Sequence, residues 1–308
     1  MDQSAFAVFA AIVSSIVIEA APFLLLGSLL SSIIAVYVGD KALSRLARKR
    51  LPVQIALGLF AGLLLPTCEC GVVPVTRRLI RKGVPAGAAF PFMLAAPVVN
   101  PVSMASTWVA FQGSWEMVAW RVALVLVPAA MLGWALGAAG AESPLRPALD
   151  MAHDAGCGCC HAHADQQARP SIGQGLLDVL RGTGREFLDM GMFLILGACA
   201  AGLFKVFLPQ ELLAAVSGSV WTAVPAMMLA AVLMSVCSEA DAFVAASLSM
   251  FPPAALLAFL AIGPMLDLKL IPAFLAVFRR KIALVLILAP ATAVYLLAMG
   301  LGLSGALP

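Results

Sequence analysis

Two short polar motifs inside long apolar stretches carry the side chains that are best suited to chemistry. The first is Cys68-Glu69-Cys70-Gly71, and the second is Cys237-Ser238-Glu239-Ala240-Asp241. Thiols and carboxylates are costly in hydrocarbon, so ionisable residues in a membrane segment indicate a functional site. Thiolates select soft ions such as Cu(I) and Zn(II), and trivalent metalloids share that preference. The motifs therefore predict a site for a thiophilic substrate.

The first motif is expected to supply the principal ligands. Gly71 would permit a turn in which the thiols of Cys68 and Cys70 converge. Glu69 would balance charge or carry a proton. The alternative is that a cysteine here acts only as a small buried hydrophobe, as we expect for the lone Cys199.

The second motif is expected to complete the site or to carry counter-protons. Cys237 offers another thiol, and Glu239 and Asp241 place two acids within three residues, which suits transport coupled to protonation. The alternative for Asp241 is an ion pair with Lys269 or a place in a water-filled vestibule.

Asn100 and Asp267 are further candidates because each follows a proline-containing break in an apolar run. The sequences around them are Pro97-Val-Val-Asn100-Pro101 and Gly263-Pro264-Met-Leu-Asp267. Proline removes a backbone donor and disfavours helix in the residue before it, so both runs should be discontinuous helices. Side-chain oxygens and unwound carbonyls at such breaks can bind a polar substrate. Helix capping is the alternative role, and the two are compatible.

A polar segment in the middle of the chain contains every histidine and a cluster of cysteines. Mixed thiolate and imidazole ligands suit Zn(II), copper or similar ions, although the spacing matches no zinc finger. We therefore expect a flexible metal-collecting segment; the alternative is a loop of biased composition. Its predicted ligands are His153, Cys157, Cys159, Cys160, His161 and His163.

Composition indicates an integral membrane protein. Of its 308 residues, 62% are hydrophobic and 11% are charged, whereas soluble domains carry about 25% charged residues. The run from Ser4 to Val38 lacks a basic start and is too long for a signal peptide, so we expect it to be retained. The seven cysteines suit a reducing compartment, and the net charge of +3 gives no indication of nucleic acid.

The apolar runs repeat in the same order in the two halves of the chain. Phe23-Leu-Leu-Leu-Gly27 matches Phe193-Leu-Ile-Leu-Gly197, Cys68 matches Cys237, and further matches follow at offsets of 167–170 residues. Such a duplication is typical of transporters. It predicts a first membrane repeat over 1–140, a Cys/His-rich linker over 141–171 and a second repeat over 172–308.

Basic residues indicate how the repeats are oriented. Sixteen of the 19 Lys and Arg fall in clusters around 41–50, 77–82, 146–185 and 279–281, which the positive-inside rule assigns to the cytoplasm. Residues 51–76 must then enter and leave from the same side, as a re-entrant hairpin. The fold predicted is all-α and polytopic, with two inverted-topology repeats and both termini outside. Each repeat would hold about three transmembrane helices, one discontinuous, plus one re-entrant hairpin; the alternative is eight simple crossings.

Residues 66–85 and 92–101, which read PTCECGVVPVTRRLIRKGVP and FMLAAPVVNP, resemble the bacterial predicted permease family. That family includes organoarsenical efflux permeases and related metal exporters. The resemblance implies a multi-pass inner-membrane permease and points to Cys68, Cys70, Gly71, Asn100 and the nearby prolines as matching residues. The linker is more like that of the metal-exporter branch.

The expected function is export of a thiophilic metal ion or trivalent (organo)metalloid, proton-coupled through alternating access. Zn, Cu or As(III) would be substrate, with no tightly bound cofactor; the bilayer and protons would be partners, and a homo-oligomer is left open. One alternative is a permease for a sulfur-containing anion. The absence of a basic residue at the hairpin tips argues against this alternative. A second alternative is a membrane thiol oxidoreductase, but Cys-x-Cys is not the spacing typical of redox motifs. A third is a non-transporting partner subunit. An enzyme is not expected, because no histidine lies in the apolar runs.

Overall fold

The computed structural model describes residues 3–37, 49–64, 67–139, 144–146, 172–207 and 218–305. Within these ranges the regular elements are all α-helices, as the apolar runs predict. A chain in lipid must satisfy its own backbone N–H and C=O groups, and a helix does so within one segment. Outside the described residues lie the six ligands predicted in the linker, His153, Cys157, Cys159, Cys160, His161 and His163.

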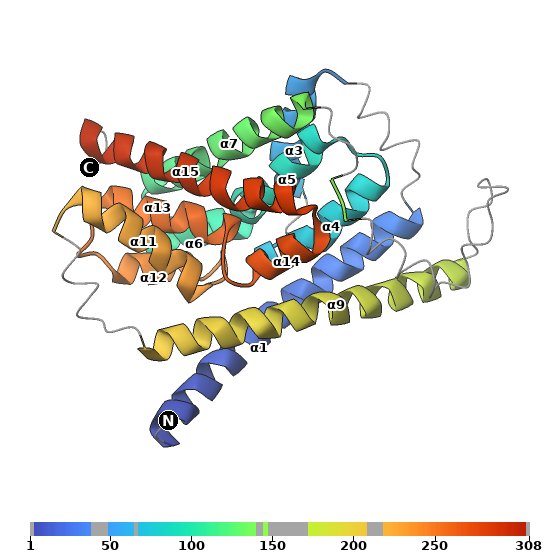
Figure 1. Cartoon of the computed structure of the whole chain (residues 1–308), viewed down its shortest axis with the longest axis horizontal. Coiled ribbons are helices and arrows are strands. Elements are labelled where there is room, and N and C mark those ends of the chain that lie inside the picture. The colour runs from blue at the N-terminus through green and yellow to red at the C-terminus, as the bar shows by residue number, and fades with distance from the viewer. Residues whose placement is uncertain are drawn as a thin grey trace.

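Helices of similar kind follow one another in the same order in the two halves of the chain (Figure 1). Each half begins with a long helix, α1 (Gln3–Tyr37) or α9 (Ile172–Phe207), and ends with α7 (Trp115–Ala138) or α15 (Arg280–Ser304). Among the described residues, four shorter helices lie between them in each half. They are α3 (Leu51–Leu64), α4 (Glu69–Arg81), α5 (Ala86–Val99) and α6 (Pro101–Ala110), and then α11 (Val220–Met234), α12 (Asp241–Ser247), α13 (Pro253–Met265) and α14 (Leu270–Val277).

Five described helical stretches are long and apolar enough to cross a membrane, or six if the bent pair α13 and α14 counts as one span. This number is close to the six full crossings that the sequence predicts. The helices of the two predicted hairpins are shorter: α3, α4, α11 and α12 have 14, 13, 15 and 7 residues. None of them reaches the roughly 20 residues that a perpendicular helical crossing needs. The chain is therefore a multi-pass helical membrane protein.

The centre of the molecule is formed by α5 and α13. Every residue of α5 except Ala86, and every residue of α13 except Pro253, is buried. A helix that is apolar all round is typically enclosed by others, and here α3 and α7 pack on α5 while α11 and α15 pack on α13. Phe90 of α5 also packs on Phe278, with ring centroids 5.5 Å apart.

The long helices α1 and α9 pack along each other on one side of this centre (Figure 1). A Cβ atom on Gly27 of α1 would collide with the backbone of Gly71, and one on Gly197 of α9 would lie 2.6 Å from the Cα of Lys269. Gly27 and Gly197 are the glycines of the repeated Phe-Leu-x-Leu-Gly sequence. That sequence therefore fixes how closely each long helix approaches the interior.

Both predicted helix breaks are present: the first lies at Asn100, directly before Pro101 as predicted, whereas the second lies beyond Pro264. α5 continues through Pro97 and α13 continues through Pro264. The backbone leaves helical geometry just beyond them, at Asn100 and at 266–269. A proline frees only one carbonyl, and neighbouring helices in a membrane protein compensate for that loss. Proline therefore weakens these helices without ending them.

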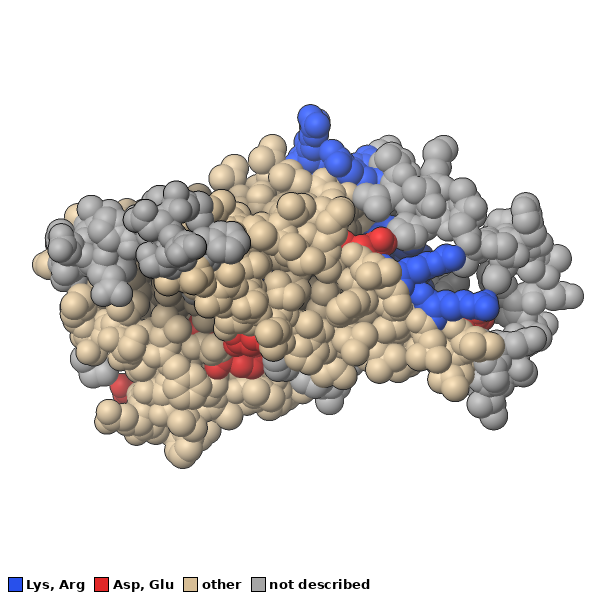
Figure 2. Space-filling model, turned by 90° about the horizontal axis from the view of Figure 1, so that it is seen from below, with Lys and Arg blue, Asp and Glu red and all other residues tan. Residues whose placement is uncertain are grey.

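Basic residues from separate parts of the chain share one end of the molecule. Arg78 of α4 approaches Glu186 of α9, with 3.7 Å between Nε and Oε2. At the start of α15, the Arg279 N–H donates to the carbonyl of Pro144 at 3.0 Å. Figure 2 shows Lys and Arg toward one end of a mostly uncharged face, whereas Asp and Glu also appear nearer its middle. The predicted basic clusters on α4, α9 and α15 thus lie together.

Candidate functional site

The two polar motifs meet in the interior, and the two helix breaks meet them there. Ser238 joins the motifs, because its hydroxyl and its backbone N–H donate to Oε2 of Glu69 at 3.1 and 3.4 Å. The hydroxyl of Ser103, near the first break, donates to the carbonyl of Ser238 at 3.0 Å. At the second break, the N–H of Leu268 donates to Oγ of Ser235 at 3.2 Å. The two motifs and the residues beside the two helix breaks therefore converge in one place.

Glu69 occupies the first position of α4, which Cys68 precedes as the extended N-cap residue. Unpaired backbone N–H groups at a helix N-terminus favour a negative charge there. The Glu69 side chain is fully buried, with 0% of its surface exposed. A buried carboxylate at this position needs partners, and the second motif provides them.

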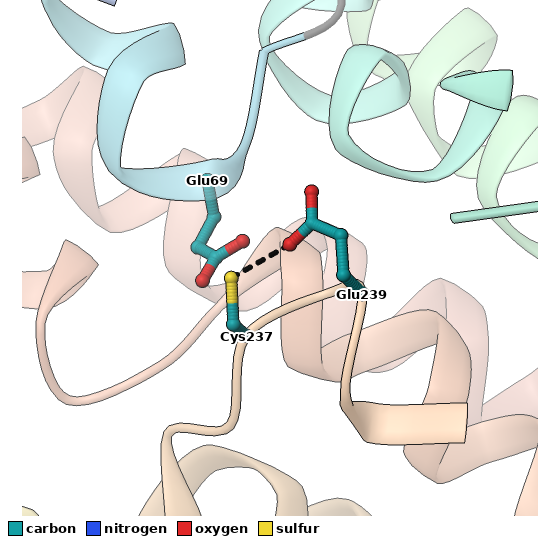
Figure 3. A group of neighbouring side chains, drawn as sticks. All are labelled: Glu69, Cys237 and Glu239. Atoms are coloured by element: carbon teal, nitrogen blue, oxygen red, sulfur yellow. Dashed lines mark hydrogen bonds between the residues drawn. The ribbon is translucent and has the colours of Figure 1, made fainter. Parts of the chain in front are cut away.

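Glu69, Cys237 and Glu239 form a group in which one donor atom from each lies within 4.8 Å of the others (Figure 3). The thiol of Cys237 donates to Oε2 of Glu239 at 2.7 Å. Figure 3 shows the Glu69 side chain extending from the first motif toward Cys237 of the second. Within the ranges that the structure describes, this is the one group of three acids, cysteines or histidines close enough to hold a metal ion. Zn(II) accepts such mixed sulfur and oxygen ligands.

Cys68 and Cys70 flank this group. Cys68 is buried and Cys70 is partly buried. Their thiols lie within hydrogen-bonding reach of each other, and each interacts electrostatically with Cys237. The predicted convergence of the thiols is thus present, with the third cysteine beside it.

The predicted role of Gly71 is wrong. It is the third residue of α4, and the described glycines with positive φ are Gly83, Gly113 and Gly305 instead. The backbone of Gly71 lies against α1, because a Cβ atom on Gly27 would collide with the Cα of Gly71. Gly71 therefore lies at a close approach between two helices and not in the turn that the sequence suggested.

Lys269 and Asp267 enter the site from the second break. The ammonium nitrogen of Lys269 lies 3.4 Å from Oε1 of Glu69 and 3.2 Å from Oδ2 of Asp267. Oδ1 of Asp267 accepts from the backbone N–H groups of Lys269 and Leu270 at 2.9 and 2.7 Å. Asp267 therefore caps α14 and holds the lysine at the same time.

Asn100 is the corresponding residue at the first break, and its role there is capping. Its side-chain oxygen accepts from the N–H of Val102 at 2.9 Å, at the start of α6. It is buried, and its helix reaches the second motif through Ser103 rather than through Asn100 itself. The structure thus shows the capping alternative at both breaks.

Arg121 of α7 pairs with Asp241, which corrects the suggested Asp241–Lys269 pair. Nη2 of Arg121 lies 2.7 Å from Oδ2 of Asp241 and 3.2 Å from the carbonyl of Ser238. Nη1 donates to Oγ1 of Thr107 at 2.6 Å. The arginine is only 1% exposed and is among the largest fully buried side chains. It holds the second motif against α6 and α7.

Sequence reasoning missed Arg121 and gave Lys269 only an incidental part. A signal was available: along with Lys205, they are the basic residues outside the four basic clusters. The argument that no basic residue serves the hairpin tips is therefore wrong, since α7 and the second break supply two. Even so, the site holds four carboxyl groups and two cations, so its formal charge would be −2 with all four acids ionised. Such a balance favours a cation over an anion.

A cavity of about 380 Å³ connects the site with the N-terminal half of α1. Its α1 wall runs from Val8 to Ala20 and includes Glu19, while Cys237 and Lys269 line its inner end. A second cavity of about 20 Å³ lies on the other side and is lined by Cys70 and Lys269. The first falls within the size range of ligand pockets, and the second has room for about one water molecule.

Comparisons with known proteins agree over nearly the whole chain. A family described as "Predicted permease" matches residues 5–303. The chain is 36% identical over 286 residues to "UPF0718 protein YcgR" of Bacillus subtilis, covering 92% of this chain and 94% of that protein. It is 33% identical over 275 residues to a Streptococcus mutans protein named "Putative two-component membrane permease complex subunit", covering 89% of this chain and 88% of that one. No solved structure matches.

Proposed function

Because this chain belongs to the predicted permease family, we propose that it is a transporter that exports a thiophilic metal ion or trivalent (organo)metalloid. The observation that carries the proposal is the group of Glu69, Cys237 and Glu239, whose donor atoms lie within 4.8 Å of one another. Cys68 and Cys70 stand beside it and would supply further soft ligands. Substrate would bind where the two halves of the chain meet.

The transport cycle would use an inverted repeat. The three domains would be the repeats 1–140 and 172–308 and the linker 141–171. The basic end would face the cytoplasm of a bacterial inner membrane, as the positive-inside rule requires. Each hairpin would then enter from the opposite face, and rocking of one repeat against the other would alternate access to the site.

The linker would collect the ion in the cytoplasm, through its cysteines and histidines. Thiols release protons when they bind a metal, so binding at Cys68, Cys70 and Cys237 provides a physical route to proton coupling. Glu239 is the best placed proton carrier, because it is only partly buried and pairs with no described cation.

The rival functions fit the site less well. For a sulfur-containing anion, Lys269 and Arg121 would be the binding groups, but each is already paired with an acid. For a thiol oxidoreductase, Cys68 and Cys70 would form a disulfide and an electron acceptor would be required. The formal charge of −2 supports a cation.

The decisive experiment is transport by full-length protein in proteoliposomes. The substrates are Zn(II), Cu(I), arsenite, methylarsenite and sulfur oxyanions. We expect flux with a metal or metalloid and strong loss of flux in Cys237→Ser and Glu69→Gln. Cys199→Ser, outside the group on α9, is the matched control and should behave as wild type. Flux only with sulfur oxyanions would reject the proposal.

A second subunit is a further part of the proposal. The Streptococcus mutans relative is named as a subunit of a two-component membrane permease complex, and we propose a comparable partner here. Proteoliposomes that contain this chain alone would test that point, since full flux without any other protein would show that no partner is needed.

A further inference from the structure

Lys269 lies between two carboxylates that belong to opposite halves of the chain. Its ammonium nitrogen is 3.4 Å from Oε1 of Glu69 and 3.2 Å from Oδ2 of Asp267. The lysine is 4% exposed, and both acids are 0% exposed. Nearly equal distances mean that a small rotation of the side chain would place the ammonium on either acid alone.

The two acids differ in what else they can bind. Glu69 belongs to the group with Cys237 and Glu239, so a metal ion at that group would use the carboxylate that Lys269 now contacts. A substrate cation at this carboxylate would be repelled by the nearby ammonium, because charges in a buried site are poorly screened. The ammonium and a substrate cation therefore compete for Glu69.

Asp267 offers the displaced ammonium a place to go. Its Oδ1 is held by the backbone N–H groups of Lys269 and Leu270, which fixes the carboxylate at the start of α14. Its Oδ2 is buried and, among the described residues, has the Lys269 ion contact but no hydrogen bond. That oxygen can take the ammonium fully without losing another partner.

Lys269 also lines both cavities. It lines the 380 Å³ cavity together with Cys237, and the 20 Å³ cavity together with Cys70. The Cα of Lys269 lies against Gly197 of α9, so movement is left to its side chain. The ammonium-bearing side chain therefore borders the space beside Cys237 and the space beside Cys70.

We propose that Lys269 is a tethered counter-cation: its ammonium holds Glu69 while the site is empty, moves to Asp267 when a substrate cation binds, and returns when the cation leaves. This proposal rests on the proposed function. With Lys269 on Glu69, the empty transporter would keep its buried charge balanced. It could then change back to its starting conformation without a bound ion, a step that net export requires. Exchange of one bound ion for another never passes through the empty state, so it would not need Lys269.

Full-length protein in proteoliposomes separates these steps. Net flux of Zn²⁺ or Cu⁺ is measured into vesicles without the ion, and exchange is measured as isotope entering vesicles loaded with the same ion. For Lys269→Gln we expect net flux to fall by about tenfold or more, the usual scale of coupling between sites. Exchange should stay within about twofold of wild type, and half-saturation of exchange should occur at a lower ion concentration.

Three further variants serve as controls. Lys281→Gln removes an exposed lysine at the start of α15 and should change neither flux. Lys269→Arg keeps the charge and should retain more net flux than Lys269→Gln. Lys269→Gln combined with Asp267→Asn removes the pair together and keeps a capping oxygen, so it reports on Lys269 even where the single variant fails to fold.

Each outcome decides between the ideas. Loss of net flux with retained exchange supports the tethered cation. Equal loss of both fluxes in the double variant, or no loss of either, overturns it and leaves the proposed function standing. Wild type that carries arsenite but neither Zn²⁺ nor Cu⁺ likewise removes the Lys269 proposal alone. Wild type that carries no metal or metalloid, even when reconstituted together with the proposed partner subunit, rejects both.

Discussion

Arg121 reaches three groups that lie on two other parts of the chain. Its guanidinium contacts Asp241 and the carbonyl of Ser238 in the second motif and Thr107 on α6. The same Ser238 donates to Glu69. The position of the second motif relative to Glu69 therefore depends on a residue that itself touches no part of the proposed ligand group.

Arg121→Met is expected to destabilise the protein by about 3–5 kcal/mol, because it leaves Asp241 buried without its cation. Arg121→Met combined with Asp241→Leu should recover most of that loss, since no unpaired charge remains. Thermal unfolding in detergent, followed by loss of monodisperse protein, measures both effects. A double variant as unstable as the single one would show that the pair is not the main contribution of Arg121.

Cys68→Ser tests the soft-ligand hypothesis at a single atom. A hydroxyl is a poor ligand for thiophilic ions, so the variant should lose metal resistance in cells while inserting at wild-type levels. The measurement is growth under metal or arsenical stress, with membrane fractions assayed for the protein. Cys199→Ser provides the control, and undiminished resistance in Cys68→Ser would count against a thiol pathway.

At the scale of the helices, glycine contacts on the long helices α1 and α9 help to position the motifs. Gly197 presses on the backbone of Lys269, whereas Gly191, two turns earlier on α9, has nothing within 4 Å of where a Cβ would stand. The two glycines thus form a matched pair on one helix. Gly197 should not tolerate a side chain, whereas Gly191 should.

Gly197→Ala should destabilise the protein by about 1–3 kcal/mol, the usual cost of overpacking a tight contact. It should also lower transport, because the α13–α14 break must shift. Gly191→Ala should be neutral or slightly stabilising, since alanine favours helix. Thermal unfolding and proteoliposome flux test both variants, and equal behaviour of the two would refute the tight approach of α9.

Variants of Asn100 can distinguish a capping role from a role in substrate binding. Asn100→Ala should cost about 1 kcal/mol through loss of the α6 cap. Asn100→Ser keeps a capping oxygen but changes what the side chain could offer a substrate. If capping is the whole role, the serine variant retains both stability and flux, as judged by unfolding and proteoliposome assays. Selective loss of flux in the serine variant would instead indicate substrate contact.

Over the whole molecule, patterns in the sequence predicted the type and arrangement of elements better than they predicted the partners of individual side chains. Apolar run lengths predicted an all-α membrane protein, and repeated motifs predicted that the two Cys-containing motifs would meet. Periodicity and composition report burial and element type, so these inferences did not depend on three-dimensional detail. Arg121, by contrast, lies 117 residues from its Ser238 contact.

Partners such as these are set by packing between helices, which no local pattern encodes. The role of Gly71 was misjudged for the same reason: glycine serves both turns and close helix contacts, and only the position of α1 distinguishes the two. Pro101 marked the first break at the right residue, but α5 continues through Pro97 and α13 through Pro264, because neighbouring helices decide where a weakened helix ends.

The inverted repeat has its own test, because it makes corresponding residues face opposite sides of the membrane. Lys82, after α4, and Ser249, after α12, correspond at an offset of 167 residues. In Figure 1 the α12 hairpin lies at the end of the molecule away from the start of α15, where basic residues gather. Eight simple crossings would put both positions on one side instead.

Single cysteines at these positions distinguish the two arrangements. In a background with serine at the linker cysteines, Ser249→Cys should react with a membrane-impermeant maleimide in intact spheroplasts. Lys82→Cys should react only after the membrane is opened, because the positive-inside rule keeps its basic cluster cytoplasmic. Gel shift of the labelled protein is the measurement. Reaction of both cysteines from the same side would exclude the inverted repeat, and with it the rocking of mirrored halves about Glu69 and Cys237.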